Sequence, residues 1–90
     1  MKVKKNGETI GTVNTTEELI ELLDDAISSA LYSIPEEEMP IEVVMNEIQR
    51  WYEEKMYVDI DTFKSYNIDC YDPEGLGEVE GTLFSFTLEK

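Results

Sequence analysis

Closely spaced carboxylates are the side chains of this sequence whose types and spacing could support chemistry. Asp59 and Asp61 lie two positions apart, and Asp69 and Asp72 lie three positions apart. Such pairs can bind a hard cation or serve as acid and base in catalysis. However, a calcium loop that starts at Asp59 would need glycine at its sixth position and glutamate at its twelfth, where this chain has lysine and cysteine. We therefore expect no specific metal site and no other cofactor.

Other catalytic arrangements also find little support. The chain has no histidine, the usual base of nucleophilic triads. Cys70 has the acidic neighbours Asp69 and Asp72, which oppose thiolate formation, so we expect a small buried strand residue. The stretch EGLGEVEG holds three glutamates that would repel a phosphate, and a 90-residue chain has little room for a glycosidase cleft. We expect that the protein is not an enzyme.

Net charge is the most unusual property of the chain. Its 21 acidic and 7 basic residues give −14, and residues 6–49 hold 11 acids and no base. A surface with this charge repels phosphate groups, so direct binding to nucleic acid or to an anionic membrane is disfavoured. The charge therefore indicates a basic protein as the partner.

The stretch IPEEEMPIE, residues 34–42, concentrates this charge between two predicted helices. Carboxylates three or four positions apart on a helix have Cβ atoms about 5 to 6 Å apart, close to the scale on which duplex DNA repeats its charges along the helix axis, about 3.4 Å per strand. Rows of acids on a rigid scaffold can therefore imitate nucleic acid. We expect one continuous contact surface made of Glu17, Glu21, Asp24, Asp25, Glu36, Glu37, Glu38, Glu42, Glu47, Glu53 and Glu54.

The elements that must position these acids begin with a hairpin. The pair Asn6 and Gly7 tolerates the two positive φ angles of a type I′ turn. Strands are predicted from Lys2 to Lys5 and from Glu8 to Val13. The two-residue turn sets Lys5 opposite Glu8, and it sets Val3 opposite Ile10.

Two helices follow the hairpin. Thr15 and Glu18 form a capping box, which predicts a helix from Thr16 to about Ser33. Pro40 suits the first position of a second helix that runs to about Lys55. The apolar residues of this second helix recur at helical spacing, with Trp51 beside them: Ile41, Val44, Met45, Ile48 and Tyr52.

The C-terminal third reads as strands. The stretch from Thr62 to Tyr66 is either a single helical turn or part of a strand, and Asp72 to Gly75 has the residues of a type I turn. A final strand is predicted from Val79 to Leu88, with a bulge at Gly81. The sequence therefore predicts one α+β domain, residues 1–90, in which the N-terminal hairpin and the C-terminal strands form a small antiparallel sheet packed against two helices, in the order ββααββ.

In size and charge, and in stretches such as TTEELIELLDDAI and PEEEMP, the chain resembles the broad class of small acidic phage-encoded anti-defence proteins. This class includes DNA mimics and anti-CRISPR inhibitors. The resemblance implies binding to a nuclease, or to another nucleic-acid-handling host protein, at its basic groove. It assigns no role to any single residue.

A second class of function stays open at this point. The chain could be a small structural or assembly subunit that forms a homodimer, with an acidic surface that is only solvated. The edge of the sheet, or the cluster Trp51, Tyr52, Met56 and Tyr57, would then mediate self-association, although such aromatic residues more often belong to the core. The sequence shows neither a signal-peptide core nor an apolar run of membrane length, which favours the cytoplasm of a bacterium or of a phage-infected cell.

Overall fold

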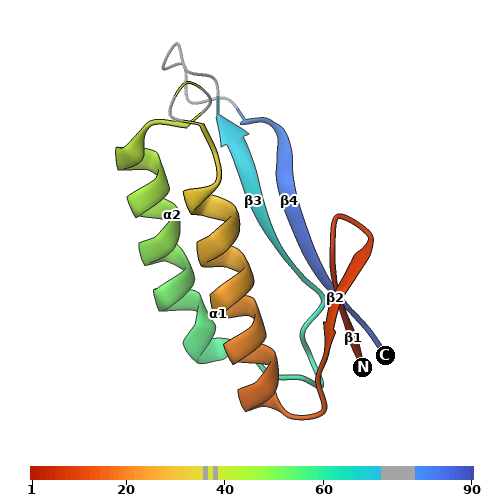
Figure 1. Cartoon of the computed structure of the whole chain (residues 1–90). Helices are drawn as coiled ribbons and strands as arrows, with labels where there is room; N and C mark the ends of the chain where they lie inside the picture. Colours follow the sequence, from red (N-terminus) through yellow and green to blue (C-terminus); the bar gives the residue numbers. More distant parts are fainter. Residues whose placement is uncertain (36, 38, 72–78) are drawn as a thin grey trace.

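Two helices cover one face of a four-stranded antiparallel sheet (Figure 1). The structure is a computed structural model, and it describes residues 1–35, 37, 39–71 and 79–90, without the side chains of residues 70, 71, 79 and 80. Its elements are β1 (Lys2–Lys5), β2 (Glu8–Thr12), α1 (Thr16–Tyr32), α2 (Ile41–Glu54), the short 3-10 helix η1 (Lys55–Tyr57), β3 (Ser65–Tyr71) and β4 (Val79–Glu89). The strand order β2-β1-β4-β3 confirms the predicted α+β fold. The predicted turn from Asp72 to Gly75 lies outside the described residues, as does the side chain of Cys70.

The N-terminal hairpin forms as predicted at its turn and differs further along. Asn6 and Gly7 have φ angles of 51° and 86°, and Lys5 pairs with Glu8. Val3, however, pairs with Gly11 in place of Ile10, because a bulge shifts the register between Val3 and Lys4. A Cβ atom at Gly11 would lie 2.6 Å from a methyl carbon of Leu22. The shift therefore places the smallest residue where α1 approaches the sheet.

Helix α1 begins with the predicted capping box. The backbone N–H of Glu18 donates to Thr15 Oγ1 (3.2 Å), and Glu18 Oε1 accepts a hydrogen bond from the N–H of Asn14 (3.3 Å). The first bond satisfies a donor that the first helical turn cannot pair internally, and the second holds the residue before the N-cap. The face of α1 that packs into the core carries Leu19, Leu23, Ile27, Ala30 and Leu31.

Helix α2 begins one residue later than predicted, with Pro40 as its N-cap, and it faces the core differently. Trp51 and Val44 are buried, whereas Met45 and Tyr52 are exposed, as is Ile41. The apolar residues that recur at helical spacing in this helix are therefore not all buried. Trp51 sets the orientation of the helix, because its ring packs edge-on against the Tyr66 ring, with centroids 5.1 Å apart.

Between α2 and β3 the chain makes a turn. The N–H of Phe63 donates to the carbonyl oxygen of Asp59 (2.8 Å), the bond of a single helical turn. β3 then begins at Ser65, so both predicted conformations occur, one after the other. In β4, register shifts against β3 flank Gly81, which has a φ of 155°, consistent with the predicted bulge.

Candidate protein-binding surface

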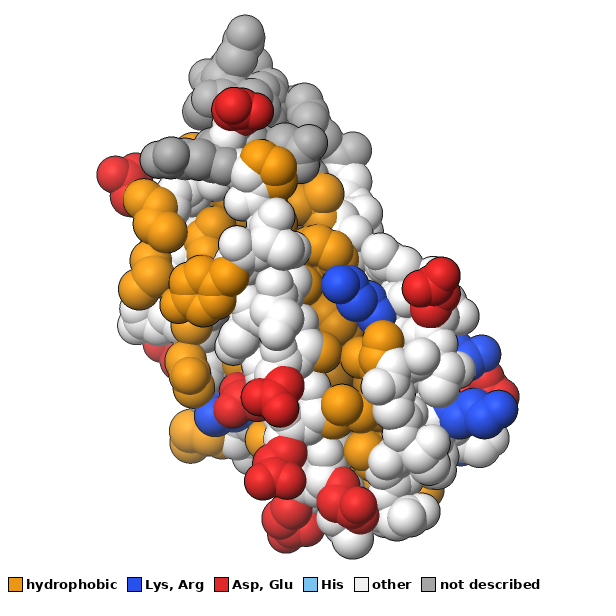
Figure 2. All heavy atoms as spheres, viewed as in Figure 1, with side chains coloured by type: hydrophobic (Ala, Val, Ile, Leu, Met, Phe, Trp, Pro, Cys, Tyr) orange, Lys and Arg blue, Asp and Glu red, His pale blue; other side chains and the backbone are white. Residues whose placement is uncertain are grey.

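Three acidic side chains form a row on the outer side of α1. Glu17, Glu21 and Asp25 are spaced four residues apart and are exposed, so they stand on one line along the helix. Among the described residues, no lysine or arginine lies within ion-pair distance of these three acids. The ion pairs there join Lys4, Arg50 and Lys55 to other acids. Figure 2 shows acidic side chains gathered over the lower end of the helical layer, where α1 begins. We call these three residues the α1 acidic row.

A shallow groove lies beside this row, between α1 and β2. Its volume is about 550 Å³, and its lining includes four acidic residues, Glu18, Glu21, Asp24 and Asp25. The opposite wall is formed by the last two residues of β2, Gly11 and Thr12, and by Val13, which follows the strand. The groove therefore extends the negative surface from the helix onto the side of the sheet.

Two of the predicted contact residues are engaged inside the protein. Asp24 Oδ1 accepts a hydrogen bond from Trp51 Nε1 (2.7 Å) and lies 3.5 Å from Lys55 Nζ. Glu47 is buried, and its Oε2 accepts hydrogen bonds from Arg50 Nε (3.1 Å) and Nη2 (2.7 Å). Asp24 and Glu47 therefore stabilise the packing of α2 in place of forming part of an exposed contact surface.

The remaining predicted acids border α2. Glu37, Glu42 and Glu53 are exposed, and Glu54 lies 4.0 Å from Arg50 Nη1. Glu36 and Glu38 lie outside the described residues. The exposed acids of the predicted surface that the structure describes thus fall into two groups, one on α1 and one on α2 and the connector before it.

An apolar strip separates the two groups. Ile41, Met45, Tyr52 and Met56 are 55%, 53%, 49% and 75% exposed. We call these four residues the α2 apolar strip. Their spacing places them on one side of α2, between the side that contacts α1 through Trp51 and Lys55 and the side that carries Glu42 and Glu53. Orange spheres along the left flank of Figure 2, over α2, show this apolar surface.

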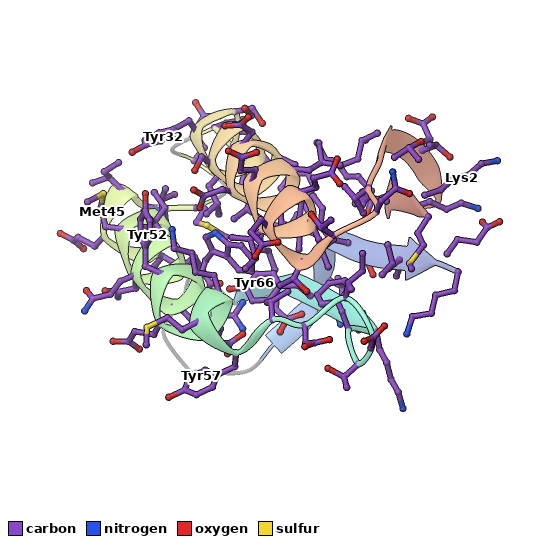
Figure 3. The ribbon with its side chains drawn as sticks, turned by 90° about the horizontal axis from the view of Figure 1, so that it is seen from below. Lys2, Tyr32, Met45, Tyr52, Tyr57 and Tyr66 are labelled. Atoms are coloured by element: carbon purple, nitrogen blue, oxygen red, sulfur yellow. The ribbon has the colours of Figure 1, made fainter. Side chains whose placement is uncertain are left out.

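Two members of the strip, Tyr52 and Met56, belong to the cluster predicted above as a possible self-association surface, but Trp51 of that cluster is buried. The exposure of Ile41 and Met45 was not predicted. The signal was present, because apolar residues occupy more of the circumference of α2 than a helix with a single buried face needs. Tyr32, at the end of α1, is also exposed and lies on the same side as Met45 and Tyr52, whereas Tyr57 points elsewhere (Figure 3). A pocket of about 320 Å³ opens at this end of the strip and has a mainly apolar lining: Leu31, Tyr32, Ile34, Met39, Ile41 and Val44.

Arg50 and Tyr66 attach α2 to the sheet. The Arg50 guanidinium lies 4.8 Å from the centre of the Tyr66 ring, and its Nη2 donates to the carbonyl oxygen of Asn67 (2.8 Å). The pKa of Arg50 is raised, because burial lowers it but the hydrogen bond to Glu47 and the neighbouring charges outweigh burial. Burial raises the pKa of Tyr66 to about 12. Its hydroxyl has no hydrogen-bond partner among the described residues.

Raising the pH above 10 is expected to destabilise the wild-type protein more than a Tyr66→Phe variant. The folded pKa of about 12 lies above the ordinary value of 10.0, so the unfolded chain releases this proton first. The stabilising contribution of Tyr66 is therefore complete below pH 10 and is lost as the pH rises toward 12. Urea unfolding of both proteins at about pH 8 and about pH 11 measures the difference. Equal losses in the two proteins would show that Tyr66 is not responsible.

In the described part of the chain, no three cysteine, aspartate or glutamate side chains converge on a site that could hold a metal ion. No helix in that part has the length and apolar character needed to cross a membrane. Comparison with protein-family models, with curated proteins and with solved structures found no match to this chain.

Proposed function

We propose that this chain is a non-enzymatic binding protein that occupies the basic groove of a nucleic-acid-handling protein, such as a nuclease, and blocks it. The observation that supports this proposal best is the α1 acidic row. It presents one carboxylate per helical turn to solvent, without a neutralising lysine or arginine among the described residues. A groove that binds phosphates would meet negative charge at a comparable spacing on this helix.

The net charge extends the reach of this row. A molecule with a charge of −14 attracts a cationic surface over roughly one Debye length, about 8 Å at physiological salt. The same field speeds encounter with a basic partner and repels nucleic acid and other acidic proteins. Selectivity for a phosphate-binding groove thus needs no catalytic residue and no cofactor in this chain.

Reversing two charges of the row is expected to abolish binding to such a partner. The test variant is Glu21→Lys with Asp25→Lys, and the matched control is Glu8→Lys with Asp61→Lys, which changes the net charge equally at exposed positions outside the predicted surface. Immobilised wild-type and control proteins should retain a host protein from lysate at low salt, and the test variant should not. Duplex DNA added at the same salt should elute that protein, because both compete for one groove.

Two results would count against the proposal. Retention that the Glu21 and Asp25 substitutions leave unchanged would exclude the α1 acidic row as the contact surface. Retention that duplex DNA cannot displace would exclude a nucleic-acid groove as the site bound on the partner.

The α2 apolar strip supports a second candidate function, self-association as a small assembly subunit. Exposed apolar patches on a helix mark interaction sites more often than chance. The uncovered face of the sheet is a weaker candidate, since Ser65, Asn67, Ser85 and Thr87 alternate with the buried residues of β3 and β4. Sedimentation velocity separates the two functions, because a salt-insensitive homodimer supports self-association and a monomer supports the proposed inhibitor.

A further inference from the structure

We infer that the α2 apolar strip is the docking site for an amphipathic helix of the partner protein, one with an apolar face and a rim of lysine or arginine. The inference rests on the proposed function, and it names the part of the partner that this chain binds. The acids supply attraction and orientation, and the strip supplies the buried contact.

The composition and shape of the strip suit a helix. From Ile41 to Met56 the strip runs over about 22 Å along α2 and η1, at ~1.5 Å per residue. A second helix laid along it would bury apolar residues at every third or fourth position, the pattern of helix-in-groove recognition. Methionine side chains adapt to partner shapes, and tyrosine supplies apolar area with little loss of conformational entropy. The pocket of about 320 Å³ beside Ile41 can take one large apolar side chain as an anchor.

Charge complementarity selects a basic rim. Glu42 and Glu53 stand exposed along the outer border of the strip. On the other side, α2 contacts α1, which carries the exposed Glu21 and Asp25. The cation that lies within this surface, Lys55, sits 4.3 Å from the centre of the Tyr52 ring and is balanced by Asp24. Lysine or arginine on both edges of a docked helix would therefore face carboxylates.

The same charges disfavour a second copy of this chain as the occupant. Pairing two strips would bring the borders of both molecules together, with the acids of one near the acids of the other. Like charges held close at an interface cost binding free energy, and a net charge of −14 on each copy adds long-range repulsion. Among the occupants considered, a basic amphipathic helix satisfies both the apolar strip and its acidic borders.

A synthetic leucine–lysine peptide tests this inference directly. The probe has about fifteen residues, with leucines at helical i, i+3, i+4 and i+7 positions and lysines elsewhere. Its control has the same composition in scrambled order, which keeps the charge and removes the apolar face. At about 150 mM salt, where surface charges are screened, the patterned peptide should bind the wild-type protein and gain helical circular dichroism, and the scrambled peptide should bind weakly.

Matched variants of the protein complete the experiment. Met45→Ser with Tyr52→Ser should weaken binding of the patterned peptide by about tenfold or more, as expected for loss of two central contacts. Tyr57→Ser, at a tyrosine that is more exposed than Tyr52 and points away from the strip (Figure 3), should leave binding unchanged. All three positions are exposed, so circular dichroism should show that the variants remain folded.

Three outcomes would overturn the inference. The two peptides could bind equally, the Met45 and Tyr52 substitutions could leave the affinity unchanged, or sedimentation could show a homodimer that these substitutions dissolve. Failure of the proposed function is visible separately. Suppose that the Glu21 and Asp25 substitutions abolish capture of the host protein that DNA displaces. If the Met45 and Tyr52 substitutions leave that capture unchanged, the proposed docking site is wrong and the proposed function stands.

Discussion

Replacing Trp51 with alanine is expected to lower the free energy of unfolding by about 3 to 5 kcal/mol, the range measured for truncation of large buried aromatic residues. The side chain is 1% exposed, packs edge-on against Tyr66, and donates its indole N–H to Asp24 at 2.7 Å. Truncation would leave a cavity and would also remove a hydrogen bond that joins the two helices. Since domains of this size are stable by about 5 to 15 kcal/mol, much of the stability would be lost.

The neighbouring residue supplies the control for this prediction. Tyr52 is also aromatic but is 49% exposed, so Tyr52→Ala should change the free energy of unfolding by no more than about 0.5 kcal/mol. Chemical denaturation of both variants measures the contrast. Similar losses for the two variants would show that Trp51 does not set the orientation of α2.

Replacing Arg50 with alanine is expected to cost about 3 kcal/mol, the lower end of the range for removing one partner of a buried ion pair. The Glu47 side chain is 7% exposed, whereas that of Arg50 is 38% exposed, so water moderates the loss on the arginine side. The variant would leave the Glu47 carboxylate buried without its two hydrogen bonds from Arg50. It would also remove the bond to Asn67 that ties α2 to β3.

A double variant separates the ion pair from the other contacts of Arg50. If the unpaired carboxylate causes most of the loss, Glu47→Ala combined with Arg50→Ala should be more stable than Arg50→Ala alone, because no buried charge then lacks a partner. Gln49→Ala, at an exposed position on the same helix, controls for changes in helix propensity. The two residues act independently if their effects add. In that case the double variant would lose the free energy of unfolding that Arg50→Ala and Glu47→Ala lose separately.

These two predictions bear on function through the orientation of α2. The contacts of Trp51, Arg50 and Glu47 with α1 and β3 determine which side of the helix is buried. The α2 apolar strip is exposed because those contacts occupy the opposite part of the helix. Variants that loosen this attachment should therefore weaken partner binding indirectly, and the exposed substitutions at Met45 and Tyr52 are the cleaner probes of the interface.

Local sequence signals predicted most of the fold. Asn6 and Gly7 specify a turn because their backbones accept positive φ angles, and the Thr15 and Glu18 capping box marks the start of α1. Such signals act between residues close in the chain. The sequence alone therefore determined the order of strands and helices, most of their boundaries, and the excess of negative charge.

Tertiary packing decided the features that depend on distant residues. Gly11 pairs with Val3 because Leu22, on α1, lies where a larger side chain would stand. Glu47 is buried because Arg50 can pair with it beside β3, and Asp24 is withdrawn from the acidic surface by Trp51 and Lys55. A helix with more apolar residues than one core face can hold must leave some of them in water. Only the positions of its neighbours determined that these would be Ile41, Met45, Tyr52 and Met56.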